Sequence, residues 1–102
     1  MNCIFELLLE IEKNVKLYIG DCDLHALKHL ITGYYLCLHP APNSREACEW
    51  QDFSQSVSNY FNDNRSISMF TCISEHTSSK EEAFKIFFEL LHQYIASHNC
   101  TQ

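Results

Sequence analysis

The most constraining feature of this sequence is the stretch from Ser78 to Ser97, which is apolar on most sides of the helix it would form. Ser78 or Ser79 can cap its start, and a glutamate three residues further on can complete a capping box. Apolar side chains then dominate: Ala83, Phe84, Ile86, Phe87, Phe88, Leu90, Leu91, Tyr94 and Ile95. The remaining positions form a narrow polar stripe: Lys85, Glu89, His92 and Gln93. A helix with so little polar surface must be covered on several sides, so we predict that it forms the core.

Composition favours helices for the rest of the chain. The 102 residues are 46% apolar and 13% aromatic, which is ample for one packed core. Only two glycines and two prolines are present, whereas a sandwich or barrel of short strands needs many tight turns. We therefore predict an all-α fold, with residues 1–102 forming a single-domain helical bundle of about five helices.

Three further helices follow from apolar periodicity and from turn residues. The first is expected over residues 2–17, with Gly20 marking its exit. The second starts after Asp21 or Asp23 and ends before the proline-rich loop at 39–44. The third is capped by Asn43 or Ser44 and extends to residue 61. Gly33 lies inside the second helix and costs up to about 1 kcal/mol there, so we expect another backbone to approach it closely.

The segment from Arg65 to His76 is ambiguous. Ile67, Met69, Thr71 and Ile73 alternate with other residues as they would in a strand. A short helix also fits the segment, and a lone strand would have no partner in an otherwise helical chain. We favour the helix.

The charge of the chain points towards a basic partner. The formal net charge is −6, so the surface repels the phosphates of nucleic acids and of anionic membranes. We expect neither direct nucleic-acid binding nor membrane binding. A basic protein is favoured because complementary charges speed encounter and disfavour wrong partners. The alternative is that the acidic surface serves solubility alone.

The cysteines indicate a reducing compartment. Six are present, at positions 3, 22, 37, 48, 72 and 100. The first residues lack a basic region and carry glutamates within their apolar run, unlike a signal peptide. We therefore expect a cytoplasmic protein with reduced cysteines. Because no C-x-x-C pair occurs, zinc ribbons and thioredoxin-like sites are unsupported, and we expect no metal and no cofactor.

Two other arrangements of chemically active residues are weaker. His25 and His29 are four residues apart and can share a metal, but a zinc site needs further ligands and the H-E-x-x-H glutamate is missing. We interpret them as exposed surface histidines. A catalytic Cys–His pair stays open, because its members would meet only in the folded chain. No sequence signature supports it, and we expect no enzymatic activity.

The best candidate for a binding site lies on the third predicted helix. Glu46, Glu49 and Asp52 lie beside Trp50, as acidic residues do around a tryptophan anchor in a protein interface. As a catalytic carboxylate pair they would need an apolar cleft to raise one pKa. Two alternatives stay open for Trp50, a place in the core and a place in the interface.

Three motifs suggest a family. They are Lys16-Leu17-Tyr18-Ile19-Gly20, then Leu24, Leu27 and Leu30 followed by Gly33-Tyr34, and finally Glu82-Ala83-Phe84 followed by Phe87-Phe88-Glu89-Leu90-Leu91. In this order they resemble small bacterial immunity proteins of polymorphic toxin systems, including contact-dependent growth inhibition. The segment from Pro40 to Ser79 lies outside the shared pattern, and a toxin-binding surface is expected to vary most there.

The resemblance implies a protein without catalytic activity that binds a cognate toxin domain, often a nuclease, and blocks it. A nuclease is basic because it must bind nucleic acid, so an acidic inhibitor is suited to cover its site. On this view Glu46, Glu49, Trp50 and Asp52 form the toxin-binding surface. A small regulatory or adaptor domain is the alternative, and a metal-dependent hydrolase is a third hypothesis.

Overall fold

A computed structural model of the chain describes residues 3–39, 41, 43–65 and 67–98. The described residues form six helices and contain no strand. In chain order the helices are α1 (Cys3–Lys13), α2 (Val15–Tyr18), α3 (Leu24–Leu38), α4 (Arg45–Tyr60), α5 (Met69–Glu75) and α6 (Lys80–His98). The prediction of an all-α fold is therefore confirmed. The radius of gyration is 13.2 Å, close to the ~13 Å of a compact domain of about 100 residues.

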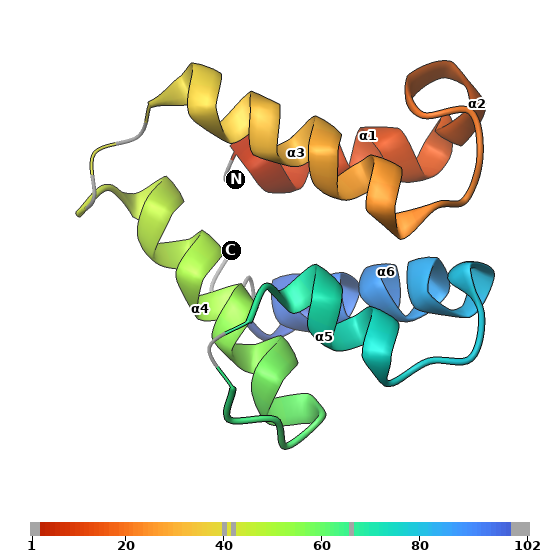
Figure 1. Ribbon diagram of the computed structural model, residues 1–102. Coiled ribbons are helices and arrows are strands. Elements are labelled where there is room, and N and C mark those ends of the chain that lie inside the picture. Colours follow the sequence, from red (N-terminus) through yellow and green to blue (C-terminus); the bar gives the residue numbers. More distant parts are fainter. Residues whose placement is uncertain (1–2, 40, 42, 66, 99–102) are drawn as a thin grey trace.

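The helices pack in two groups. The long helices α1 and α3 run alongside each other in the upper part of Figure 1, while α4, α5 and α6 lie below them. Both α3 and α4 contact α5 and α6, so the two groups share one core. None of the helices in the described parts of the chain combines the length and the hydropathy that a bilayer-spanning segment requires.

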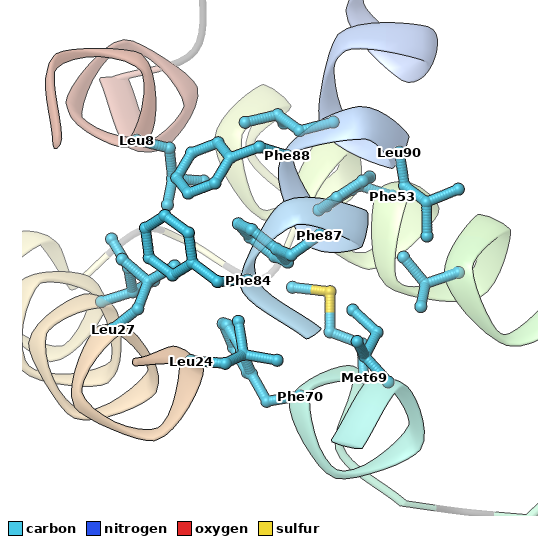
Figure 2. Packing of buried hydrophobic residues seen from close by; sticks show 14 of the residues in the cluster. Leu8, Leu24, Leu27, Phe53, Met69, Phe70, Phe84, Phe87, Phe88 and Leu90 are labelled. Atoms are coloured by element: carbon cyan, nitrogen blue, oxygen red, sulfur yellow. The ribbon is translucent and has the colours of Figure 1, made fainter. Parts of the chain in front are cut away.

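Helix α6 is the core helix, as its pattern predicts. Seven of its residues are buried: Ala83, Phe84, Phe87, Phe88, Leu90, Leu91 and Tyr94. Figure 2 shows Phe84, Phe87 and Phe88 extending from α6 among side chains of the other long helices and α5. The start of α6 is capped as expected, since the backbone N–H of Glu82 donates to Oγ of Ser79 at 3.1 Å. The Glu82 carboxylate in turn accepts from the backbone N–H of Ser78 at 2.7 Å.

The first predicted helix is interrupted at Asn14. The backbone there leaves the helical region, with φ −135° and ψ 53°, and α2 begins at the next residue. The Asn14 side chain donates to the carboxylate of Glu10 at 3.0 Å, a local bond of the kind that competes with continuous helix. The prediction of one helix over 2–17 was therefore wrong in its continuity. The chain exit at Gly20 is confirmed, with φ +81°.

The predicted caps of α3 and α4 are confirmed. The carboxylate of Asp23 accepts from the backbone N–H of His25 at 3.0 Å, and Oγ of Ser44 accepts from that of Ala47 at 3.2 Å. The expectation about Gly33 was wrong. Gly33 is exposed, and a Cβ added to it would meet no atom within 4 Å. Solvent surrounds this position, so no close backbone contact offsets the cost of the glycine.

Helix α5 settles the ambiguous segment in favour of a helix. Its buried residues are Met69, Phe70, Cys72 and Ile73, which is helical rather than alternating spacing. Oγ of Ser68 caps the helix by accepting from the backbone N–H of Phe70 at 3.2 Å. The strand alternative fails because these four side chains must face the same core together.

Candidate functional site

The four residues predicted to bind a partner lie on two different sides of α4. Asp52 is exposed and faces the end of α6, where its carboxylate accepts from the hydroxyl of Tyr94 at 2.8 Å. Glu46 and Glu49 are half-buried, and the carboxylate of Glu49 lies 3.4 Å from Nε of Arg45. Trp50 faces α3 and α5 instead. The structure thus places three acids and an aromatic residue on one helix, but not on one flat surface.

Trp50 belongs to both the core and the surface. Its ring lies 6.3 Å from that of Phe5 and 6.1 Å from that of Phe53, within the aromatic cluster. The side chain is nevertheless half-buried and lines a groove that is open to solvent. Trp50 therefore fits both alternatives: one part of its side chain packs in the aromatic cluster, and another part is accessible from the groove.

The groove lies between α3, α4 and α5 and has a volume of about 360 Å³. Its apolar lining is Ile31, Tyr35, Leu36, Trp50, Ile67, Met69 and Phe70. Leu36 is 63% exposed at its edge, which is high for a large apolar side chain. The lining includes one charged residue among those described, the half-buried Lys28. An apolar hollow with an exposed leucine and an anchored tryptophan has the features of a protein-binding surface.

The groove continues into a more polar hollow of about 280 Å³. The two share Gln51, Ser54, Ile67 and Met69. The second hollow also reaches Asp63 and Arg65, in the turn that follows α4. One side of α4 therefore borders a continuous depression, apolar towards α3 and charged towards the turn.

A network of charged side chains joins this turn to α5. Arg65 donates to both carboxylate oxygens of Asp63, from Nε to Oδ1 at 3.0 Å and from a terminal nitrogen to Oδ2 at 2.7 Å. The same nitrogen also pairs with the carboxylate of Glu75. These hydrogen bonds from Arg65 hold the pKa of Asp63 well below its usual range. Reciprocally, the bonds to Asp63 and then Glu75 raise the pKa of Arg65.

A thiol and an imidazole complete the network. Sγ of Cys72 lies 3.8 Å from Oδ2 of Asp63, and Nε2 of His76 lies 3.2 Å from the same oxygen. Cys72 is fully buried, whereas His76 is exposed and stacks on the ring of Phe61 at 4.8 Å. Burial, and then the charge of Asp63, raise the pKa of the Cys72 thiol.

The fold thus brings a cysteine and a histidine together, but not as a nucleophile and its base. A catalytic cysteine must be accessible and must form its thiolate readily. Cys72 is inaccessible, and its raised pKa disfavours the thiolate. The geometry at Cys72 and His76 therefore gives no support to a Cys–His nucleophile.

The two histidines of α3 lie close to each other, as their four-residue spacing predicts. Nε2 of His25 and Nε2 of His29 are 3.1 Å apart, and both residues are exposed. Among the residues that the structure describes, no third potential ligand joins them, whereas Asp63, Cys72 and His76 do form a three-residue group. This three-residue group was not predicted from the sequence. Its one visible signal is the four-residue spacing of Cys72 and His76, in the segment whose structure was ambiguous.

Comparisons of the chain with known protein families, curated proteins and solved structures gave no match.

Proposed function

We propose that this protein is a non-catalytic immunity protein that binds a basic toxin domain, a nuclease by preference, and neutralises it by protein–protein contact in the cytoplasm. The observation that carries the proposal is the surface of α4. There an anchored Trp50 opens onto an apolar groove, while Glu46 and Glu49 lie on adjoining parts of the same helix. The resemblance of the sequence motifs to immunity proteins supports the same function.

Charge is the first part of the recognition. The chain has 13 acidic and 7 basic residues, so its field attracts a basic partner over a distance. A nuclease must present basic residues to phosphates, and an acidic protein that covers those residues competes directly with nucleic acid. Complementary charge of this kind mainly raises the association rate.

The apolar groove is the second part. Trp50 packs against both Phe5 and Phe53, so little conformational freedom is lost when a partner covers it. An apolar side chain of the toxin inserted beside Trp50 and Leu36 would be shielded from water, as in an interface hot spot. Lysines or arginines flanking that side chain would then lie near Glu46 and Glu49.

One observation favours a second candidate function, that of a small regulatory or adaptor domain. The charged residue that lines the groove is Lys28, a cation. An apolar segment that carries a carboxylate fits this lining better than a basic one does. Such a partner would depend on Lys28 and on Leu36 rather than on the acids of α4.

The proposal is tested with the partner itself. The tagged protein is used to isolate a binding protein from the source organism, and that protein is then expressed with and without this chain. We expect expression alone to stop growth and co-expression to restore it. A partner that is not toxic, or whose toxicity persists on co-expression, would contradict the proposed function.

The site is tested by charge reversal. Replacing Glu46, Glu49 and Asp52 by lysine together should slow association and weaken its dependence on salt. The matched control reverses three exposed acids on other helices, Glu6, Glu81 and Glu89, and produces the same net charge. If the two triple variants bind alike at low and at high salt, the acids of α4 are not the site.

The apolar part of the site is tested separately. Trp50→Ala should speed dissociation by at least about 30-fold, as loss of a hot spot of about 2 kcal/mol does. Leu36→Ala should act in the same direction, and its 63% exposure leaves the fold intact. Lys28→Ala separates the two functions, because it should weaken an adaptor complex and leave binding of a basic toxin domain unchanged or stronger.

A further inference from the structure

We propose that Asp63, Cys72 and His76 form a binding site for one zinc ion. Each residue offers one ligand atom, and the three atoms all lie within 4.8 Å of one another. Thiolate sulfur, imidazole nitrogen and carboxylate oxygen are all zinc ligands, and a set that mixes them suits zinc better than calcium or magnesium. None of the three residues lines the apolar groove itself, although Asp63 lines the polar hollow that continues it. The site requires no partner protein.

Two of the three distances between the ligand atoms are close to those around a tetrahedral ion. With Zn–S near 2.3 Å and Zn–N or Zn–O near 2.0–2.1 Å, tetrahedral angles separate neighbouring ligand atoms by about 3.3–3.6 Å. Oδ2 of Asp63 lies 3.2 Å from Nε2 of His76 and 3.8 Å from Sγ of Cys72. These two pairs are within a few tenths of an ångström of the separations that zinc requires. The ligand atoms of Cys72 and His76 lie within 4.8 Å of each other, so this pair must close by at most about 1.2 Å. Three protein ligands leave the fourth position to a water molecule.

The fold holds all three side chains in place. Cys72 and His76 are four residues apart, on the same side of the last turn of α5 and its C-cap. Asp63 comes from the turn after α4, where its side chain is 7% exposed and accepts from the backbone N–H of Arg65 at 3.1 Å. The ring of Phe61 lies nearly parallel to that of His76, at 14°, and limits its rotation. Such outer contacts orient metal ligands and strengthen binding.

Arg65 provides the positive charge of the site when no metal is bound. It lies between the carboxylates of Asp63 and Glu75. Its side chain is 54% exposed, so it can leave Oδ2 of Asp63 and keep the bond from Nε to Oδ1. With zinc bound and Cys72 as a thiolate, the formal charges of the ion, Arg65, Cys72 and the two carboxylates cancel. The buried Cys72 thiolate would then be balanced by the positive charges beside it.

Zinc at this site would join the turn after α4 to α5. Because the ligand atoms come together only in the folded chain, zinc would bind the folded state and raise its stability. Zinc must also displace the proton of Cys72, so binding should release a proton and weaken as the pH falls.

The first experiment uses the unmodified protein. After removal of metal with a chelator, the protein is titrated with Co²⁺, which reports sulfur ligation through a thiolate-to-cobalt absorption band, and then with Zn²⁺ in competition. We expect one ion per chain, the thiolate band, and displacement of cobalt by zinc. Absence of the band in the unmodified protein would overturn the proposal.

The second experiment assigns the ligands. His76→Gln and Cys72→Ser should each weaken zinc binding by more than about 100-fold, beyond the roughly 10–100-fold typical of residues outside the ligand shell. Two matched controls, His29→Gln and Cys48→Ser, replace the same residue types at exposed positions and should leave zinc affinity unchanged. Loss of zinc in His29→Gln but not in His76→Gln would place the metal at the histidine pair of α3 and refute the site.

Loss of a zinc ligand can be distinguished from loss of folding. Cys72 is buried and its serine variant can be destabilised, but His76 is exposed and its glutamine variant should keep the fold. Zinc should raise the melting temperature of the unmodified protein and of His29→Gln, and should leave that of His76→Gln unchanged. Equal increases in all three proteins would count against the site.

Discussion

Replacing Phe87 with alanine tests whether α6 is the centre of the fold. Phe87 is fully buried, and its ring lies 5.3 Å from that of Phe70 and 5.8 Å from that of Phe53. Removing the buried ring loses the free energy gained by its transfer out of water, about 1.5–3 kcal/mol. A cavity on the order of 100 Å³, at about 24 cal/mol per Å³, adds about 2.4 kcal/mol. We therefore expect Phe87→Ala to lower the free energy of unfolding by about 4–5 kcal/mol.

Such a loss approaches the whole stability of an ordinary domain, which is about 5–15 kcal/mol. Urea denaturation followed by far-ultraviolet circular dichroism measures it. Phe87→Leu should lose only about 1–2 kcal/mol and keeps the comparison measurable if the alanine variant does not fold. Leu36→Ala is the surface control, since its side chain is 63% exposed and should change stability by no more than about 0.5 kcal/mol. If Phe87→Ala unfolds cooperatively with the same stability as Leu36→Ala, the core assignment is wrong.

Three further predictions concern stability and thiol reactivity. Gly33→Ala should raise the free energy of unfolding by about 0.5–1 kcal/mol, because the added Cβ meets no atom within 4 Å, and a decrease in urea denaturation would contradict this. Arg65 lowers the pKa of Asp63 in the folded state. The ionised Asp63 therefore contributes fully to stability above pH ~4, and this contribution is lost as the pH falls further. Metal-free Asp63→Asn should therefore lose less stability than the unmodified protein between pH ~5 and ~2 in urea titrations, and parallel profiles would refute the assignment. Mass spectrometry after alkylation should find Cys48 labelled in the folded protein and Cys72 only after unfolding; equal rates at both would contradict the burial of Cys72.

The helices were predictable because their signals are local. Asp23 and Ser44 cap the helices that follow them through hydrogen bonds within three residues, which the sequence displays directly. The break at Asn14 was not predicted, because it depends on a competition between the side chain and the backbone that periodicity does not report. Gly33 was misjudged for a related reason: a glycine inside a helix shows its cost in the sequence, but not whether anything packs against it.

The candidate sites were harder to predict because they depend on neighbouring helices. Trp50 and Asp52 are two residues apart on α4, yet one lines a groove towards α3 and the other bonds to Tyr94 of α6. Their separation follows from where α3 and α6 pack, which no pattern within residues 45–60 contains. Asp63 likewise joins Cys72 only because the turn after α4 folds back onto α5.

The position of α6 in the chain has a consequence for biosynthesis. The helix that the others pack against is translated after all of them. While the first five helices leave the ribosome, the apolar faces that Leu8, Phe53 and Phe70 present to α6 have nothing to cover them. Such uncovered surface promotes aggregation. The nascent chain therefore cannot complete its core until α6 has been synthesised, and its incomplete forms expose apolar surface during that time.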